Sequence, residues 1–346
     1  MASSQNVSIQ SHLKPLLLTF AGWKALLLSI ALGTSVAPAY DTSTSLALGL
    51  DVPWSSGLSN GSSLAASWTD LLTERLTRWD AIYFIRIASR GYLYEQEWAF
   101  GTGLPLLVSW LASGLGLVGL GAPSTSDADY QQQQQHENTP NLDPRTAALL
   151  SILVATTSHL LAVLTLYKLT DKLFPERRIA FLTALLHIFS PAGLFLAAPC
   201  AESLFAFLTF AGLLVYAHGC YRHGVARGLH VVLTGGLLGL ATACRSNGIL
   251  NGVIFAVEAA VGLLQLARRP SLGGALSLLP VMVGGLLVGA GSAVPQWVAY
   301  RRYCVETDAG SSGREWCARR IPSIYNFVQS HYWYVYWPLL LSGLFY

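Results

Sequence analysis

Long runs of apolar residues, separated by short polar segments, repeat along most of the chain. Each run approaches the ~20 residues that an α-helix needs to cross the hydrocarbon core of a bilayer. This pattern predicts an all-α membrane protein that crosses the bilayer several times. The predicted spans are Leu16–Val36, Phe100–Gly121, Thr146–Leu169, Ile179–Ala198, Ser203–Ala217, Val231–Ala243, Ile249–Ala267 and Leu276–Ala299. A last apolar run, Tyr336–Tyr346, is too short to cross.

The composition agrees with a membrane protein and excludes a nucleic-acid-binding one. Of the 346 residues 53% are hydrophobic and only 11% are charged, whereas a soluble domain carries roughly 25% charged residues. The formal net charge of +3 is small, and the basic residues stand at the ends of the apolar runs, where anionic headgroups attract them. We therefore expect the bilayer as a partner and no nucleic acid.

The N-terminal apolar run has two interpretations. Lys14 and Lys24 with Leu16–Leu32 are typical of a signal peptide, and Ala37-Pro38-Ala39 resembles a small-residue cleavage site. The apolar stretch is long, however, and a proline lies inside the cleavage motif. A retained first helix is the favoured interpretation.

Three polar segments interrupt what we predict to be a single membrane domain over residues 1–346. Residues 38–99 form a long first loop that carries amphipathic helices, and its acceptor Asn60-Gly61-Ser62 indicates a lumenal face. Residues 123–144 are of low complexity, with glutamine at positions 131 to 135. Residues 300–333 form a further loop with Cys304 and Cys317, which can pair if the loop faces an oxidising lumen.

The basic residues raise a problem of orientation. They cluster after the third, fifth and seventh predicted spans, at Lys168, Lys172, Arg177 and Arg178, at Arg222 and Arg227, and at Arg268 and Arg269. The positive-inside rule places all three clusters in the cytosol. Counting spans from a lumenal first loop places them on the other side, so either the charge rule fails or the glycine-rich run at 100–121 is re-entrant. The re-entrant interpretation also makes residues 300–333 lumenal.

Two carboxylates are candidates for proton transfer near the membrane surface. Asp41 stands alone after the first apolar run, and Asp80 lies in an aromatic and basic amphipathic segment. A general base needs to lie within hydrogen-bond reach of the hydroxyl that it activates. The alternatives are structural: Asp41 as a helix cap, and Asp80 as one half of an ion pair with Arg78 or Arg86 in an interfacial helix.

Arg245 is the candidate for binding an anion. It follows the apolar run at 237–244, and an arginine at or inside the membrane costs at least ~2.5 kcal/mol on insertion scales. A guanidinium there can hold a phosphate in a bidentate fork, unless it merely snorkels from a helix end. Asn247 and Glu202 are further candidates, while Glu258 is expected to pair with a neighbouring helix. No Cys/His group has the spacing of a zinc site.

An ordered set of motifs resembles the family of GPI mannosyltransferase 2, the PIG-V family. The motifs are Trp79-Asp80, Tyr83-Phe84, Gly91-Tyr92, Ser190-Pro191-Ala192, Ala198–Phe205, Cys244–Gly248, Trp316-Cys317 and Pro322–Trp333. The resemblance runs from Tyr40 to Trp333, and the ordered set is far more specific than any one of its members.

The resemblance implies a multi-pass endoplasmic-reticulum enzyme of the GT-C glycosyltransferase class. Such an enzyme takes mannose from dolichyl-phosphate mannose and adds the second mannose of a GPI precursor through an α-1,6 link. The resemblance implies Asp41 and Asp80 as catalytic residues and Arg245 as the residue that holds the dolichyl phosphate. Substrate binding is assigned to Trp79, Arg86, Glu95, Glu202, Arg245, Asn247 and His331. It also implies no cofactor or metal, and a small membrane partner subunit.

The chain departs from the family pattern in two places. Gly101-Thr102-Gly103-Leu104 replaces the second Phe of the usual Ala-Phe-Phe-Pro and shifts the proline to Pro105. After Trp333 the family usually continues with further spans, whereas this chain ends at Tyr346. We therefore expect a chain shortened at its C-terminus relative to the family. Two alternatives stay open: an inactive fragment of the transferase, and a transporter or scramblase with Arg245 and Glu258 along its path. We find no internal repeat of the kind typical of transporters.

Overall fold

The computed structural model describes residues 2–34, 43–49, 68–117, 142–305 and 314–333. This part of the chain is helical and contains no strand, as the apolar pattern predicted. Six of its segments are long and apolar enough to cross a membrane. They are His12–Gly33, Pro144–Leu173, Glu202–Gly219, Gly224–Cys244, Ser246–Arg268 and Leu272–Val305.

The described helices fall into a long and a short group. The long helices are α1 (Ala2–Gly33), α7 (Pro144–Leu173), α9 (Glu202–Gly219), α10 (Gly224–Cys244), α11 (Val253–Arg268) and α12 (Leu272–Tyr300). The short α-helices are α2 (Ser43–Leu48), α3 (Trp68–Leu76), α4 (Asp80–Arg90), α5 (Gly103–Gly114), α8 (Arg177–Ile188) and α13 (Ile324–Val328). Short 3-10 segments are η2 (Glu95–Ala99), η5 (Gly193–Leu196) and η6 (Ser246–Gly252), and π-helical turns are η7 (Arg301–Val305) and η8 (Gln329–Trp333).

Six of the eight predicted spans correspond to helices long enough to cross, and two do not. In the run Phe100–Gly121 the described residues, 100–117, contain the 12-residue helix α5, about 18 Å long and too short to cross. The run Ile179–Ala198 forms the 12-residue helix α8, because Pro191 disfavours helical backbone in the residue before it. The chain continues beyond the break as irregular backbone and the 3-10 segment η5.

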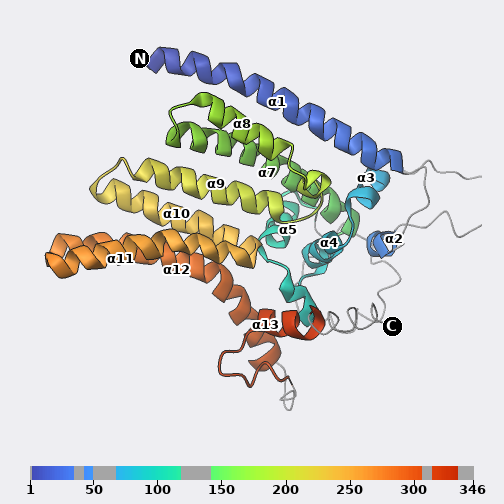
Figure 1. The fold of residues 1–346 in the computed structure, drawn as a ribbon. Coiled ribbons are helices and arrows are strands. Elements are labelled where there is room, and N and C mark those ends of the chain that lie inside the picture. Colours follow the sequence, from blue (N-terminus) through green and yellow to red (C-terminus); the bar gives the residue numbers. More distant parts are fainter. Residues whose placement is uncertain (1, 35–42, 50–67, 118–141, 306–313, 334–346) are drawn as a thin grey trace, which may run out of the picture.

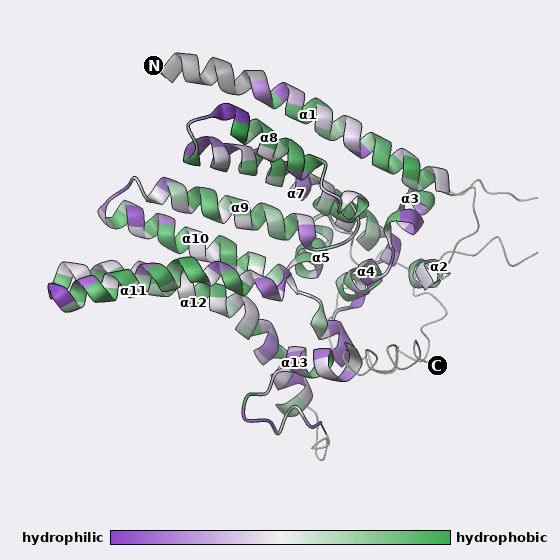
Figure 2. Cartoon of the chain, viewed as in Figure 1, coloured by the Kyte–Doolittle hydropathy of each residue, from purple (hydrophilic) through white to green (hydrophobic). Residues whose placement is uncertain are grey.

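The long helices lie side by side in a bundle, and their basic turns gather at one end of it. The turns from α7 to α8, from α9 to α10 and from α11 to α12 lie at the end that holds the N-terminus (Figure 1), where hydrophilic residues are concentrated (Figure 2). The positive-inside rule makes this the cytosolic end. The chain leaves and re-enters the opposite end around α5, since the Leu142 amide bonds to the Ser89 carbonyl at 3.2 Å. The short helix α5 in the described part of this run agrees with the re-entrant interpretation.

The helix α1 is part of this bundle. Leu16 and Phe20 of α1 pack with Ala180, Ala184 and Ile188 of α8 in one buried cluster. A cleaved signal peptide would leave this apolar surface of α8 uncovered, so the packing agrees with a retained first helix.

Glycines set the closest helix contacts in the bundle. A Cβ on Gly235 of α10 would overlap the backbone of Gly284 in α12, and one on Gly291 would overlap the backbone of Gly239. Small residues allow this close approach, which is how helices gain packing energy in lipid. Gly101 and Gly103, the departure from the family pattern, lie similarly tightly against Cys244 at the end of α10.

The end of the molecule opposite the basic turns carries a second, more polar unit, which we call the cap. It consists of η2 and residues 301–305 and 314–333, which include α13, and α4 connects it to the bundle. Its apolar core joins Tyr92, Trp98, Trp316, Ile324 and Val328. The cap lies against the ends of α10 and α12 (Figure 1), so any site at this seam takes residues from both units.

Candidate active site

The Trp79-Asp80 pair lies at the start of α4. This helix forms because Ala81, Ile85 and Ala88 recur at helical spacing and bury one face. Trp79 precedes the helix with a φ of 52°, in the left-handed region that a bulky residue rarely adopts. Its ring is 71% exposed, and Asp80 is exposed in the first turn. The strained backbone at Trp79 directs its ring and the carboxylate of Asp80 toward the surface. Strained backbone of this kind clusters at functional sites.

A half-exposed ion pair lies at the ends of two neighbouring bundle helices, α9 and α10. Glu202 is the first residue of α9 and Arg245 caps the end of α10, and the two side chains form a salt bridge. Their exposures of 34% and 40% leave both open to a ligand. The second carboxylate oxygen of Glu202 has no hydrogen-bond partner among the described residues. Glu202 and Arg245 can therefore each form a contact with a substrate, either beside their ion pair or in its place.

Cys200 links these two elements into one site. Burial first, and then the charges of Glu202 and Asp80, raise the pKa of its thiol, while Arg245 opposes the shift. Asp80, Glu202 and Arg245 thus act on one buried sulfur from different helices. The thiol stays protonated and is a poor nucleophile. We call Trp79, Asp80, Cys200, Glu202 and Arg245 the Asp80 site.

Tyr83 is a site residue that sequence reasoning passed over. It lies one turn after Asp80 on the same helix and stacks on Phe100, with ring centroids 4.5 Å apart. Burial, with the charges of Glu97 and Asp80, raises the pKa of its phenol. A protonated phenol beside Asp80 can donate a hydrogen bond to a sugar oxygen. The available signal was the i, i+3 spacing from Asp80.

The structure places Asn247 close to the Asp80 site and His331 on the cap. Asn247 is exposed in η6, two residues after Arg245. Ser246 donates to the Tyr325 hydroxyl at 3.1 Å, so α13 of the cap approaches η6. His331 is exposed and stacks on Phe327 at 5.0 Å. Its predicted role in substrate binding stays a prediction.

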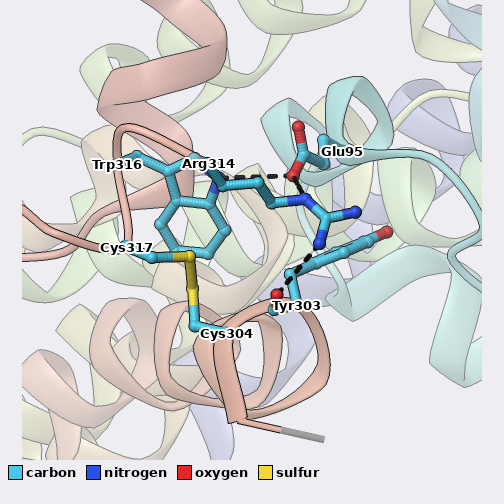
Figure 3. The surroundings of a disulfide bond; sticks show 6 residues. All are labelled: Glu95, Tyr303, Cys304, Arg314, Trp316 and Cys317. Atoms are coloured by element: carbon cyan, nitrogen blue, oxygen red, sulfur yellow. Dashed lines mark hydrogen bonds and ion pairs between the residues drawn. A yellow bond between two sulfur atoms is a disulfide. The ribbon is translucent and has the colours of Figure 1, made fainter. Parts of the chain in front are cut away.

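Glu95 is engaged within the cap. Its carboxylate pairs with Arg314 at 2.6 Å and accepts from the Trp316 indole nitrogen at 3.3 Å (Figure 3). Arg314 in turn donates to the Tyr303 carbonyl at 3.0 Å. Glu95 therefore fastens η2 to the loop after α12, and a contact with substrate stays a prediction for it.

The disulfide Cys304–Cys317 closes the same loop, with the two Cα atoms 5.8 Å apart (Figure 3). The sequence had left this pairing open. Disulfides persist in oxidising compartments, so the bond agrees with the positive-inside rule in placing the cap on the non-cytosolic side.

Glu97 is a second carboxylate that sequence reasoning passed over, and its surroundings are structural. It is 2% exposed, pairs with Arg90 at 2.7 Å and accepts from the amides of Leu93 at 2.7 Å and Tyr94 at 3.2 Å. These bonds close the turn after α4, the helix that carries Asp80. A buried pair of this kind has no short sequence signature, because Arg90 and Glu97 are seven residues apart.

The remaining predicted residues are Arg86 and Asp41. Arg86 lies partly buried on α4, six residues from Asp80 and so not its neighbour on the helix surface. Asp41 lies outside the described residues. The chain resumes at α2, where Thr44 donates to the Thr77 carbonyl at 2.6 Å. The segment just after Asp41 is thus fastened to the segment just before Asp80.

The described part of the chain holds no group of three or more His, Cys, Asp or Glu side chains placed to bind a metal ion. The Asp80 site instead offers a carboxylate for a proton, a guanidinium for a negative charge, and exposed aromatic surface. This donor set suits the transfer of a group from an anionic leaving group to a hydroxyl.

Comparisons with known proteins point to one family. The family model described as mannosyltransferase (PIG-V) matches residues 18–120 and 139–339. GPI mannosyltransferase 2 of Chaetomium globosum is 41% identical over 95% of this chain and 72% of its own length. The protein of the same name in Gibberella zeae is 42% identical over 92% and 67%. GPI alpha-1,6-mannosyltransferase 2 of Rattus norvegicus is 31% identical over 77% and 52%. No solved structure matches the chain.

Proposed function

The chain belongs to the mannosyltransferase (PIG-V) family, and from this premise we propose that it adds the second mannose of a GPI-anchor precursor through an α-1,6 link. The donor is dolichyl-phosphate mannose, and the reaction takes place at the lumenal face of the endoplasmic-reticulum membrane. The relatives' names support the acceptor and the link. The Asp80 site carries the proposal, because it joins a free carboxylate and an arginine at the cap end of a membrane bundle.

The proposed chemistry is a direct displacement at the anomeric carbon of the donor. A hydroxyl of the acceptor sugar attacks this carbon as the bond to the phosphate oxygen breaks, so a β-linked donor gives an α product. The hydroxyl proton passes to a carboxylate. Asp80 is placed to accept it, since it is exposed and has no ion-pair partner among the described residues. Asp41 is the other candidate, and the Thr44–Thr77 bond supports its lying near Asp80.

The leaving group is dolichyl phosphate, which gains negative charge as the sugar departs. Arg245 is placed to stabilise that charge, with Glu202 holding the guanidinium in position before the donor binds. Trp79 offers an exposed ring for the sugar or lipid at the membrane surface. The Tyr83 phenol orients the acceptor through a hydrogen bond beside Asp80.

The test is complementation in cells that lack the second GPI mannosyltransferase, with surface GPI-anchored protein as the readout. The chain is expected to restore the surface signal, and Asp80→Ala or Asp41→Ala is expected to abolish it at equal protein abundance. Asp171→Ala is the matched control, since this carboxylate pairs with Arg177 at the cytosolic end. If the single variants Asp80→Ala and Asp41→Ala each restore the surface signal, neither carboxylate is required for the reaction. Failure of the unaltered chain at normal abundance would indicate an inactive protein.

A kinetic measurement in membranes separates the roles. Asp80→Asn is expected to lower kcat by about 10²-fold or more, as loss of a general base does. Arg245→Gln is expected to lower kcat and weaken donor binding together, because the guanidinium contacts the phosphate before and during transfer. An unchanged donor KM in Arg245→Gln would assign the phosphate to another residue.

A further inference from the structure

A cluster of polar side chains lies in the membrane interior, away from the Asp80 site. Lys24 of α1, His159 of α7 and His187 of α8 face one another across three helices. The rings of His159 and His187 are 5.1 Å apart, and the Lys24 ammonium lies within electrostatic reach of both imidazoles. Phe20 joins the helices, with the ammonium 5.7 Å from its ring centroid and its ring 5.1 Å from that of His159.

Lys24 and His159 are buried, His187 is half-buried, and most of their polar atoms lack partners among the described residues. Lys24 is 5% exposed and His159 is 1% exposed. Lys24 Nζ, both ring nitrogens of His159 and Nε2 of His187 have no hydrogen-bond partner among the described residues. Trp23, next to Lys24, packs on Phe189 at 5.1 Å and also has an unpartnered indole nitrogen. Buried polar groups are nearly always bonded, so this concentration of unmet donors indicates a missing ligand.

The cluster also lies deep in the bilayer. The part of α1 that is apolar enough to cross the membrane runs from His12 to Gly33. Lys24 is twelve residues from its start and nine from its end, or about 18 Å and 14 Å along the helix. A lysine at such depth is costly, and charged residues there mark sites that bind or conduct. A purely structural lysine would be expected to reach a helix end or to pair with a carboxylate.

The charge of Lys24 has no carboxylate partner among the described residues, unlike the charges of two arginines on the bundle helices. Arg227 pairs with Glu258 between α10 and α11, and Arg245 pairs with Glu202. No described carboxylate acts on Lys24, His159 or His187. The missing ligand is therefore an anion, and several donors on three helices suit a group with three or more acceptor oxygens better than a carboxylate does.

We propose that Lys24, His159 and His187 form an intramembrane site for a phosphate group, separate from the Asp80 site. The break after α8 provides the way in: the helix ends at Ile188 and the chain continues as irregular backbone with Phe189 half exposed. Irregular backbone at membrane depth occurs where it is buried in protein or lines a water-filled cavity. The phosphate belongs either to a lipid headgroup that enters from the bilayer or to a free phosphate. The site does not depend on which reaction the chain performs.

The experiment measures the thermal unfolding midpoint of the purified full chain in detergent, with no activity assay. The ligands are inorganic phosphate, a short polyprenyl phosphate and phosphatidylinositol, with sodium chloride at matched ionic strength as the reference. A ligand near 100 times its Kd is expected to raise the midpoint by about 2 °C or more. A rise with the lipids alone identifies a headgroup site, and a rise with inorganic phosphate alone identifies a site for the free anion.

Variants assign the effect to the cluster. Lys24→Met is expected to abolish the rise and to increase the midpoint without ligand, because it removes an unneutralised buried charge. His159→Phe keeps the ring contact with Phe20 and is expected to lose most of the rise. Lys14→Met, on the same helix, and the double variant Glu202→Gln/Arg245→Gln are expected to keep it. The proposal is overturned if no phosphate compound exceeds chloride, or if the rise survives in both Lys24→Met and His159→Phe.

Discussion

The bundle and the cap are held together by different forces. In the bundle, α10 and α12 meet backbone to backbone at Gly235, Gly239, Gly284 and Gly291. In the cap, short helices are joined by the ion pairs of Glu95 and Glu97 and by the Cys304–Cys317 disulfide. Lipid gives helices no hydrophobic reason to associate, so close packing must do it. In water, short segments need directional bonds to keep their shape.

The contrast explains where the Asp80 site lies. Asp80 and Tyr83 lie on α4, which packs on α5 and α7 and reaches the cap core through Ile87, whereas Glu202 and Arg245 stand at the ends of bundle helices. The packed bundle fixes the arginine, and α4 holds the carboxylate where the bundle meets the cap. Four variants test this division, and the first three have a control in the same unit or of the same chemistry.

The largest effect is expected where two bundle helices are packed too closely for any added side chain. Gly235→Leu places a side chain into the backbone of Gly284 and is expected to prevent stable folding, seen as loss of monodisperse protein in size-exclusion chromatography. Gly236→Leu is the control, because a Cβ there meets nothing within 4 Å. Equal yields of the two variants would show that the α10–α12 contact is not tight.

A smaller but still large effect is expected for the buried ion pair of the cap. Glu97→Gln leaves Arg90 unpaired in a buried position and is expected to cost about 3 kcal/mol of unfolding free energy. Glu74→Gln removes the exposed i, i+4 pair with Arg78 and is expected to cost about 0.5 kcal/mol or less. Chemical denaturation in detergent measures both. Similar losses in the two variants would contradict a distinction between buried and surface pairs here.

The disulfide is expected to contribute through the loop that it closes. Replacing Cys304 and Cys317 by serine opens a loop of 13 residues and is expected to cost about 2–3 kcal/mol. The loss should appear as faster proteolysis in the cap, with the bundle intact. Cys220→Ser, at an exposed free cysteine, controls for the change in thiol content. Faster cleavage within α9 to α12 would show that the two units are not separable.

The smallest effect is expected at Tyr92, together with a pH signature. Its hydroxyl donates to the Phe100 carbonyl at 3.0 Å, so Tyr92→Phe is expected to cost about 1 kcal/mol at neutral pH. Burial, and then the charge of Glu97, raise the pKa of Tyr92 above its ordinary value of 10.0. The folded state thus keeps a proton that the unfolded chain loses.

This difference gives the direction of the pH dependence. The contribution of Tyr92 is complete below pH about 10 and is lost as the pH rises further toward its folded pKa. The native protein is therefore expected to lose stability above pH 10 more steeply than Tyr92→Phe does. Parallel alkaline unfolding curves for the two proteins would show that this phenol titrates normally.

The helices could be predicted from the sequence where an apolar run is also long enough to cross a membrane. The spans that became α1, α7, α9, α10, α11 and α12 were found from hydropathy alone, because each must satisfy its backbone within itself in lipid. The two predicted spans without a long helix share a reason. The helices α5 and α8 end after 12 residues, at Gly114 and Ile188, although apolar residues continue beyond them. Hydropathy does not record where a helix ends.

The candidate site could be predicted in part. The sequence singled out Asp80, Glu202 and Arg245 as charges among apolar residues, and the structure brings these three around Cys200. It also assigned Glu95 to substrate, whereas the structure pairs it with Arg314. Glu97 was missed because nothing near it in sequence marks its partner, and Tyr83 was noted only as part of a motif, although its spacing from Asp80 was a signal. The Lys24 cluster was missed for the same reason, since Lys24 and His187 are more than 160 residues apart.

Long apolar runs and ordered motifs are local properties, and they were enough to identify a multi-pass helical membrane protein of one family. Which charges are paired, which are free and which share a site became visible only in the folded molecule. Ion pairs, the disulfide and the close glycine contacts join residues that are distant along the chain. Their partners are fixed by how the helices pack, and no local pattern records that packing.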